Sequence, residues 1–233
     1  FERYAREFER LAETEEERVL GREVGEIYRE FKTLGAEITA LTRQRNAALQ
    51  TYIANIEELD ELFDKSFKIS IDLSSSHAIE KTRAASLMDE VLDGSVGKVG
   101  RYVAHASPAL RQEIIEAEVN FKRYLARYRA TPLSADEERW LVQIDKGFGE
   151  IAKVGKGIVA LTDAMHEKLG RFRDDLERID RILDDEIQVL IQEETRRAAK
   201  DARDSGEKAI AIIAFVGLMI FGSMAGANWF VSR

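Results

Sequence analysis

The feature that most constrains the fold is one long apolar stripe with helical spacing that starts after Ser134 and leads into an uncharged C-terminal segment. Its apolar residues follow one another at steps of three or four, the spacing of one face of an α-helix. These positions are Phe148, Ile151, Val154, Ile158, Leu161, Met165, Leu169, Phe172, Leu176, Ile179, Leu183, Ile187 and Leu190. No proline interrupts the stretch, and Ser134 with Glu137 has the pattern of a capping box at a helix start. We therefore expect one very long helix from residue 134 onward.

The uncharged segment at residues 209–231 has the length of a membrane span. Its 23 residues would extend about 35 Å as a helix, and a bilayer core is about 30 Å thick. Gly222 and Gly226 form a GxxxG pattern that permits close contact between membrane helices, although glycine is also common in such helices generally. Trp229 and Phe230 stand where an aromatic anchor would meet the interface. We expect a transmembrane helix at 208–231 and the start of a cytoplasmic linker at 232–233.

Composition narrows the class further. A third of the 233 residues are charged, and the only prolines, Pro108 and Pro132, stand where helices would begin, so we expect an all-α fold. The net charge of −8 and the lack of a basic block argue against nucleic acid as a partner. Because the chain has no cysteine, disulfides, thiolate metal sites and thiol nucleophiles are excluded.

The chain contains an internal repeat, which appears when the sequence is shifted on itself by 120 residues. Two amphipathic helices can align their apolar stripes by chance, but here polar and special residues align in the same register. The aligned pairs outside the stripes are Thr14 with Ser134, Glu17 with Glu137, Gly35 with Gly155, and the Ala-Leu-Thr run at 40–42 with that at 160–162. We interpret this as a duplication.

The duplication predicts an elongated, two-module helical bundle that continues into the C-terminal transmembrane helix. Long helices at 15–73 and 134–191 would run antiparallel, and a hairpin at 77–131 would complete a distal bundle at about 45–165. A proximal bundle would combine 1–45 with 165–207, and its own hairpin would lie mostly upstream of residue 1. Residues 1–207 would together form one helical domain whose N-terminal part is missing, with a further membrane span before it.

This pattern resembles the helical bimodular sensor domains of bacterial chemoreceptors. In addition, residues 99–140 are similar to the four-helix-bundle sensors of methyl-accepting chemotaxis proteins, in which a helix ending in tyrosine is followed by one bearing an aromatic residue, a short loop and an acidic helix start. The resemblance implies a homodimeric receptor of the inner (cell) membrane. Residues 1–207 would be periplasmic and bind a small molecule, such as an organic acid, and a helix displacement would reach cytoplasmic signalling proteins through a part outside this chain.

Two other functions fit the same pattern. A membrane histidine kinase could carry the same sensor, and a tail-anchored helical scaffold would need no ligand. No enzyme site emerges. His77, His105 and His166 have no partners at metal-ligand spacing, and the paired glycines near Gly147 and Gly155 follow no strand, so they favour close helix packing or bending over phosphate binding. We expect no catalytic residue, metal or cofactor.

Arginines are the candidate ligand-binding residues, because the guanidinium fork suits small carboxylates. Arg45 is the sharpest case. It stands on the apolar stripe where the second copy has Met165, so it must pair with an internal carboxylate, extend to solvent or meet a ligand. Arg83, Arg101 and Arg111 on the predicted hairpin are further candidates for a pocket or a dimer contact.

Overall fold

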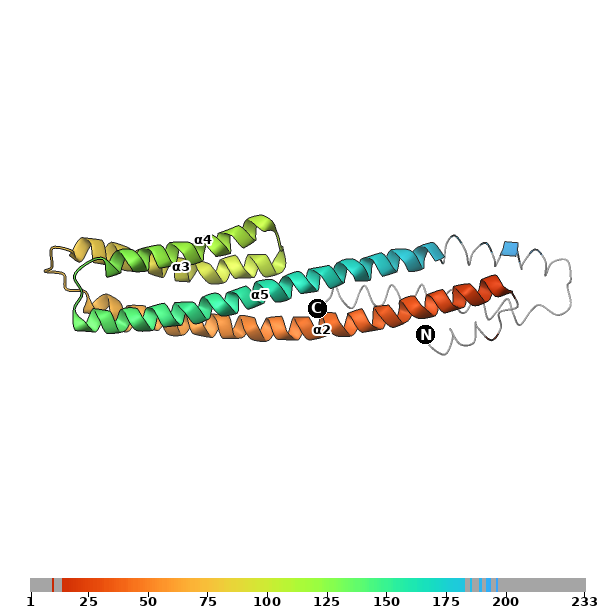
Figure 1. Ribbon diagram of the computed structural model, residues 1–233, viewed down its shortest axis with the longest axis horizontal. Coiled ribbons are helices and arrows are strands. Elements are labelled where there is room, and N and C mark those ends of the chain that lie inside the picture. The colour runs from red at the N-terminus through yellow and green to blue at the C-terminus, as the bar shows by residue number, and fades with distance from the viewer. Residues whose placement is uncertain are drawn as a thin grey trace. The chain divides into compact units, whose positions relative to one another are not determined.

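The computed structural model describes residue 10, residues 14–182 and residues 185, 189, 192, 193 and 196. Four α-helices make up most of this part of the chain: α2 (Glu15–Leu62), α3 (Ala78–Ala104), α4 (Pro108–Arg129) and α5 (Ala135–Arg181) (Figure 1). A π-helical turn, η1 (Phe63–Phe67), and a 3₁₀ turn, η2 (Lys68–Ser70), follow α2 directly. No strand occurs in these ranges, so the all-α prediction is confirmed.

The helix starts follow from local side-chain chemistry. The backbone N–H of Glu17 donates to Thr14 Oγ1 at 3.2 Å, and Thr14 N–H donates to Glu17 Oε2 at 2.9 Å. Ser134 and Glu137 make the same reciprocal pair at 3.2 and 2.7 Å. Both predicted capping boxes are therefore confirmed, and each satisfies backbone donors that a helix start leaves without an intrahelical partner.

One predicted helix boundary differs from the structure. The helix expected at 15–73 ends as an α-helix at Leu62 and continues only as the short turns η1 and η2. Beyond them Asp72 Oδ1 accepts hydrogen bonds from the Ser74 backbone N–H at 2.9 Å and its hydroxyl at 2.7 Å, which stabilises a turn in place of further helix. The long helix predicted from residue 134 is observed as α5 to Arg181, and the described residues 189, 192, 193 and 196 are also helical.

Contacts divide the chain into two compact units. Unit 1 takes its residues from the chain up to Ile38 and from Lys168 onward, and unit 2 is Thr39–Glu167. The repeat predicts this division near residues 45 and 165. In the described part of unit 1, Phe31 stacks on Phe172 with ring centroids 3.9 Å apart, and Arg178 pairs with Glu23 at 2.6 Å.

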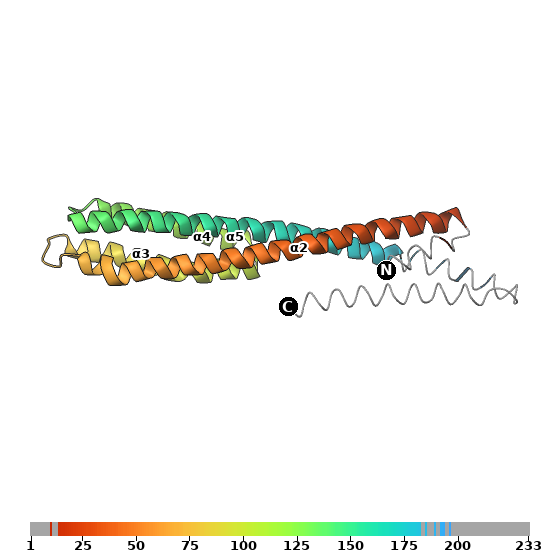
Figure 2. The ribbon, with the colours of Figure 1, turned by 90° about the horizontal axis from the view of Figure 1, so that it is seen from below.

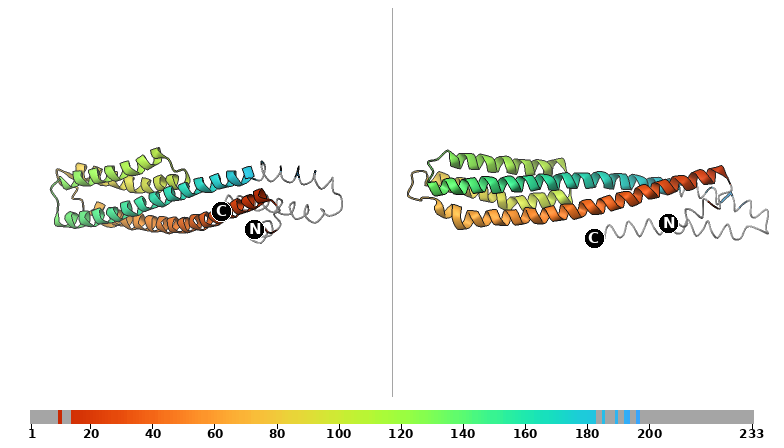
Figure 3. Two further views of the ribbon diagram at one scale, coloured as in Figure 1. Left: turned by 45° about the vertical axis from the view of Figure 1, so that its right-hand side comes forward. Right: turned by 60° about the horizontal axis from the view of Figure 1, so that its bottom comes forward.

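Unit 2 is a four-helix bundle. Figure 2 and Figure 3 show α3 and α4 side by side along the unit 2 portions of α2 and α5. Its core draws on all four helices and on η1, and its largest fully buried side chains are Phe63, Phe67, Met88, Leu92, Tyr102, Phe121, Tyr128, Leu141, Ile144 and Ile151. The Phe121 and Phe148 rings stack in parallel at 3.7 Å, which ties α4 to α5.

Two glycines let α5 approach α2 closely within this bundle. A Cβ at Gly147 would stand 3.1 Å from Leu59 Cδ1, and a Cβ at Gly155 would stand 3.2 Å from Tyr52 Cε2. Gly149 and Gly157 have nothing within 4 Å of such a Cβ. The close-packing interpretation therefore applies to the first glycine of each pair. Since residue numbers rise along α2 as they fall along α5, the two helices are antiparallel here.

A buried ion pair joins three helices of unit 2. Lys81 Nζ on α3 donates to both carboxylate oxygens of Glu137 at 2.7 and 2.8 Å, and these side chains are only 4% and 2% exposed. The Tyr128 hydroxyl of α4 donates to Glu137 Oε1 at 2.7 Å. Burial alone would raise the pKa of Glu137, but the hydrogen bonds from Lys81, from the Ser134 backbone and from Tyr128 outweigh it, so this pKa lies below its usual value.

Among the described residues, no helix is both long and apolar enough to cross a membrane. The predicted span at 208–231 lies outside the described residues. The same holds for the predicted contact residues Gly222 and Gly226 and for the predicted anchor residues Trp229 and Phe230. These four assignments stay predictions from sequence.

The buried ion pair gives a stability prediction. Lys81→Met leaves the Glu137 carboxylate buried without its cation, so we expect a loss of about 3–5 kcal/mol in the free energy of unfolding, measured by urea denaturation. The double variant Lys81→Met/Glu137→Gln removes both charges while keeping an acceptor for Ser134, so it should recover at least half of that loss. A single-variant loss below about 1 kcal/mol would show that the pair behaves like an exposed one.

Candidate functional site

A cavity of about 240 Å³ lies inside unit 2. All four helices line it, and its walls are mainly apolar: Tyr52 comes from α2, Val99 from α3, Ile114 from α4, and Phe148 and Ile151 from α5. Protein interiors are packed as densely as organic crystals and hold few voids larger than a water molecule. A largely apolar cavity of this size is therefore the leading candidate for a binding site in the described part of the chain.

Small residues at interior positions create the space. Ser95, Ala117, Ala152 and Gly155 all line the cavity. One turn along α4 from Ala117, Phe121 instead places a large ring in the core, where it stacks on Phe148. The sequence shows these small residues on apolar stripes, but it does not show that they meet at one level.

Tyr52 places a polar group against this apolar space. The residue is 4% exposed, and burial raises its pKa to about 12, with an opposing contribution from a hydrogen bond with Ser95. The hydroxyl therefore stays protonated at neutral pH and can donate a hydrogen bond. Ser95 Oγ itself donates to the Val91 carbonyl oxygen at 2.5 Å.

The cavity opens between α4 and α5. Its exposed lining residues, Arg111, Ile115 and Lys156, all belong to these helices, whereas those from α2 and α3 are buried or half-buried. Two ion pairs cross from α4 to α5 on this side. Arg111 pairs with Asp163, and Glu118 pairs with Lys156 at 2.9 Å. The two residue numbers of each pair have the same sum, which is expected when two antiparallel helices pack in one register. Both pairs therefore link α4 to α5 along the side on which the cavity opens.

A third helix takes part in one of these crossings. Tyr102 of α3 is 1% exposed, and its hydroxyl donates to Asp163 Oδ1 while accepting a hydrogen bond from Arg111 Nη2 at 2.9 Å. Hydrogen bonds to Tyr102 and Asp163 raise the pKa of Arg111, so its charge is held in place. The Arg111 guanidinium therefore already has its hydrogen-bond acceptors within the protein.

The charge at the cavity comes from three cations and one carboxylate. Arg111 is matched by Asp163, and Glu118 is shared by Lys156 and Lys122. Lys98 on α3 is half-buried and lines the cavity, and it forms no ion pair with any residue that the structure describes. Sequence reasoning missed Lys98. Its only sequence signal is its position one turn after Ser95 on the same helix face.

The four predicted arginines do not form one site. Arg111 lines the cavity, but Arg101 is exposed and pairs with Glu113, and Arg83 is exposed on α3. Arg45 lies elsewhere in unit 2, half-buried, with its Nη1 donating to Met165 Sδ at 3.5 Å. Helical periodicity places these residues on their helices, but it does not bring them to a common level.

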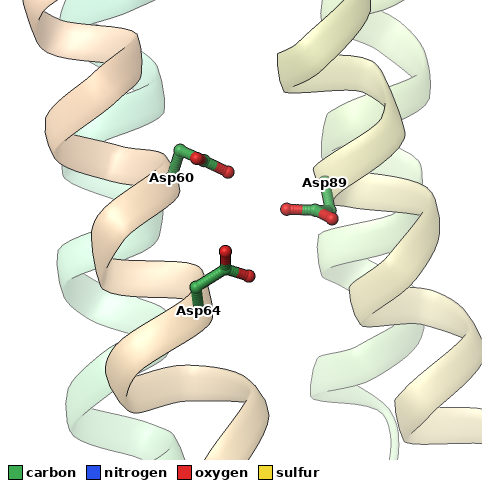
Figure 4. A group of neighbouring side chains, drawn as sticks. All are labelled: Asp60, Asp64 and Asp89. Atoms are coloured by element: carbon green, nitrogen blue, oxygen red, sulfur yellow. The ribbon is translucent and has the colours of Figure 1, made fainter.

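An acidic cluster that the sequence pattern did not predict is formed by residues of α2, η1 and α3. Carboxylate oxygens of Asp60, Asp64 and Asp89 all fall within 4.8 Å of one another (Figure 4). Such oxygens are typical ligands of hard divalent cations. Here, however, Lys68 Nζ donates to Asp64 Oδ1 at 2.7 Å and to Asp89 Oδ2 at 2.8 Å. The Lys68 ammonium already binds two of the three carboxylates, and we assign no metal to the cluster.

No family model, curated protein or solved structure matches this chain. The resemblance to chemoreceptor sensor domains accordingly stays a prediction from sequence patterns. What supports a function independently is the chemistry of the cavity, namely its mainly apolar walls with Tyr52 and Lys98 among the lining residues.

The acidic cluster gives a pH prediction. Burial and the carboxylates of Asp64 and Asp89 raise the pKa of Asp60, so folding favours its protonated form and its charge lowers stability at neutral pH. Asp60→Asn should therefore raise the melting temperature at pH 7, by a stability gain of roughly 0.5 kcal/mol or less. The gain should vanish below about pH 3.9, the pKa of an unfolded aspartate, because Asp60 is then protonated in both states. The exposed-site variant Glu57→Gln is the control, and an equal gain at pH 3 would contradict this account.

Proposed function

We propose that unit 2 binds a small, mainly apolar molecule that carries a negative charge, and that the chain is the ligand-sensing part of a transmembrane chemoreceptor. The observation that supports this most directly is the cavity of about 240 Å³ among the four helices. An apolar cavity of about 150 Å³ is known to hold benzene. The cavity of unit 2 therefore suits a molecule somewhat larger than benzene, such as an aromatic or branched aliphatic acid.

The polar groups of the cavity favour an anion. Lys98 supplies a positive charge that no described carboxylate neutralises, and the protonated Tyr52 hydroxyl supplies a neutral donor that would exchange Ser95 for the ligand as its acceptor. A carboxylate accepts from both kinds of donor, and charge-assisted hydrogen bonds are the stronger ones. The apolar body of the ligand would lie against Phe148 and Ile151.

The position of the opening supports a role in signalling. A ligand that enters between α4 and α5 contacts α5 directly, and α5 is one helix from Ala135 to Arg181. In sequence, α5 precedes the predicted membrane span at 208–231. A displacement of α5 on ligand binding is the step that a receptor would use, with a second copy of the chain as the partner against which the helix moves. In this proposal residues 1–207 lie outside the cytoplasm, the inner membrane holds the span, and signalling proteins act on a part that follows this chain.

The same experiments test two alternative functions of the chain. A sensor histidine kinase would use the cavity in the same way and would differ only in the output module. A tail-anchored scaffold would have no ligand, so it would give no role to an apolar cavity with a cation among its lining residues.

Filling the cavity tests the proposal. The full chain is titrated calorimetrically with a panel of aromatic and branched aliphatic carboxylates, and the best ligand is then tested on variants. Ala152→Phe places a ring in the cavity and should weaken binding at least about tenfold, because an over-filled site excludes the ligand. Ala160→Phe is the matched control, since Ala160 is exposed on the same helix. Unchanged affinity in Ala152→Phe would place the ligand outside this cavity, and no binding by any member of the panel would favour the scaffold.

The charge on Lys98 gives a separate prediction. Lys98→Met should weaken carboxylate binding about 10- to 100-fold, the effect of losing one hydrogen bond to a charged group. The neutral amide analogue of the same ligand should bind both proteins equally. Lys153→Met, at an exposed position on α5, serves as the control. Equal losses for the acid and the amide would show that Lys98 acts through packing and not through its charge.

A further inference from the structure

Arg45 presents a second, separate feature of unit 2. The residue is half-buried on α2, and its Nη1 donates to Met165 Sδ at 3.5 Å. Its Nε is buried and has no hydrogen-bond partner. No carboxylate among the described residues pairs with it. Arg45 does not line the cavity of unit 2, so a group that binds the Arg45 guanidinium is distinct from the ligand proposed for that cavity.

The geometry of the guanidinium identifies the edge that lacks a partner. Nη1 is the nitrogen on the same side as Cδ, so Nε and Nη2 form the opposite edge and point their N–H groups in one direction. This edge binds a carboxylate with two parallel hydrogen bonds. In Arg45 the thioether contact uses Nη1 only, which leaves the two-donor edge without a described protein acceptor.

The partners that Arg45 does have are poor ones for a cation. A thioether sulfur is a weak acceptor, and Thr42 Oγ1 also donates to the same Met165 sulfur at 3.5 Å. Burial lowers the pKa of Arg45, which means that its charged form is poorly stabilised by these surroundings. A partly buried charge of this kind requires an anion or water to complete it.

The internal repeat shows that packing does not demand an arginine here. Arg45 and Met165 occupy equivalent positions of the two copies, and in the folded chain they contact each other. Equivalent residues that contact each other lie near the approximate two-fold axis that relates the two copies. The second copy fills its place with an uncharged, flexible side chain, so a methionine also suits the stripe at this level. The charge of Arg45 therefore calls for an explanation other than packing.

We propose that Arg45 binds a small planar oxyanion, of the carboxylate class, on its Nε–Nη2 edge. The ion reaches the site from solvent, since the side chain is only half-buried, and it takes Nε as its second donor after a small change of rotamer. The site does not depend on the receptor function proposed above, and it would exist equally in a scaffold.

Thermal denaturation of the full chain in acetate tests this site, with chloride at equal ionic strength as the reference. In the original protein, acetate at ten times its Kd should raise the melting temperature by about 3 °C over chloride. Arg45→Met copies the sister position, so it should fold and lose this acetate-specific rise. Arg43→Met changes an exposed arginine two residues away and should keep it. An equal acetate-specific rise in Arg45→Met would overturn the proposal.

A second measurement uses the original protein alone, so that it does not depend on the folding of any variant. The Nε–H resonance of Arg45, assigned by its loss in Arg45→Lys, should shift on titration with acetate and not with chloride. The resonances of exposed arginines such as Arg43 should shift no more in acetate than in chloride. An Arg45 Nε–H that responds equally to both anions would overturn the proposal, even if the melting temperature rises.

Discussion

The arrangement of unit 2 depends on one buried carboxylate. Glu137 caps the start of α5, accepts two hydrogen bonds from Lys81 of α3 and accepts another from Tyr128 of α4. Each of these groups would be costly to bury alone, so they are satisfied only when the three helices meet in one register. The antiparallel register of α4 and α5 follows from that junction, and the later crossings, Arg111 with Asp163 and Glu118 with Lys156, conform to it.

Close packing and an open cavity occur in the same bundle for related reasons. Near the junction, aromatic rings fill the core, and Phe121 stacks on Phe148. Further along, Ser95, Ala117 and Gly155 replace large side chains, and the helices are held at their spacing by the ion pairs and by Tyr52 against Gly155. The junction supplies the rigidity that lets small residues leave space without collapse of the helices onto one another.

Charge is distributed unevenly around this core. Most cations of unit 2 have a carboxylate partner, including Lys68 in the acidic cluster and Lys156 at the cavity opening. Lys98 and Arg45 are half-buried and pair with no carboxylate in the described part of the chain, whereas the other cations of unit 2 without an ion pair are exposed. Binding an anion from solvent at Lys98 or at Arg45 would offset the free-energy cost of a partly buried, unpaired charge. The two sites are distinct in position and in chemistry, an ammonium beside an apolar cavity and a guanidinium edge.

By itself the sequence determined the elements and their faces. Helical periodicity, two prolines and two capping boxes were enough to predict the all-α class, the helix starts and the hairpin, and the repeat singled out Arg45 opposite Met165. Only the tertiary structure decided which side chains meet. It paired Arg111 with Asp163 and Tyr102, and it brought Lys98 to the cavity. It also placed the aspartates of α2, η1 and α3 close to Lys68. The physical reason is that periodicity acts within one helix, whereas distances between helices depend on register, on the small residues that let backbones approach and on the rotamers chosen when buried charges find partners.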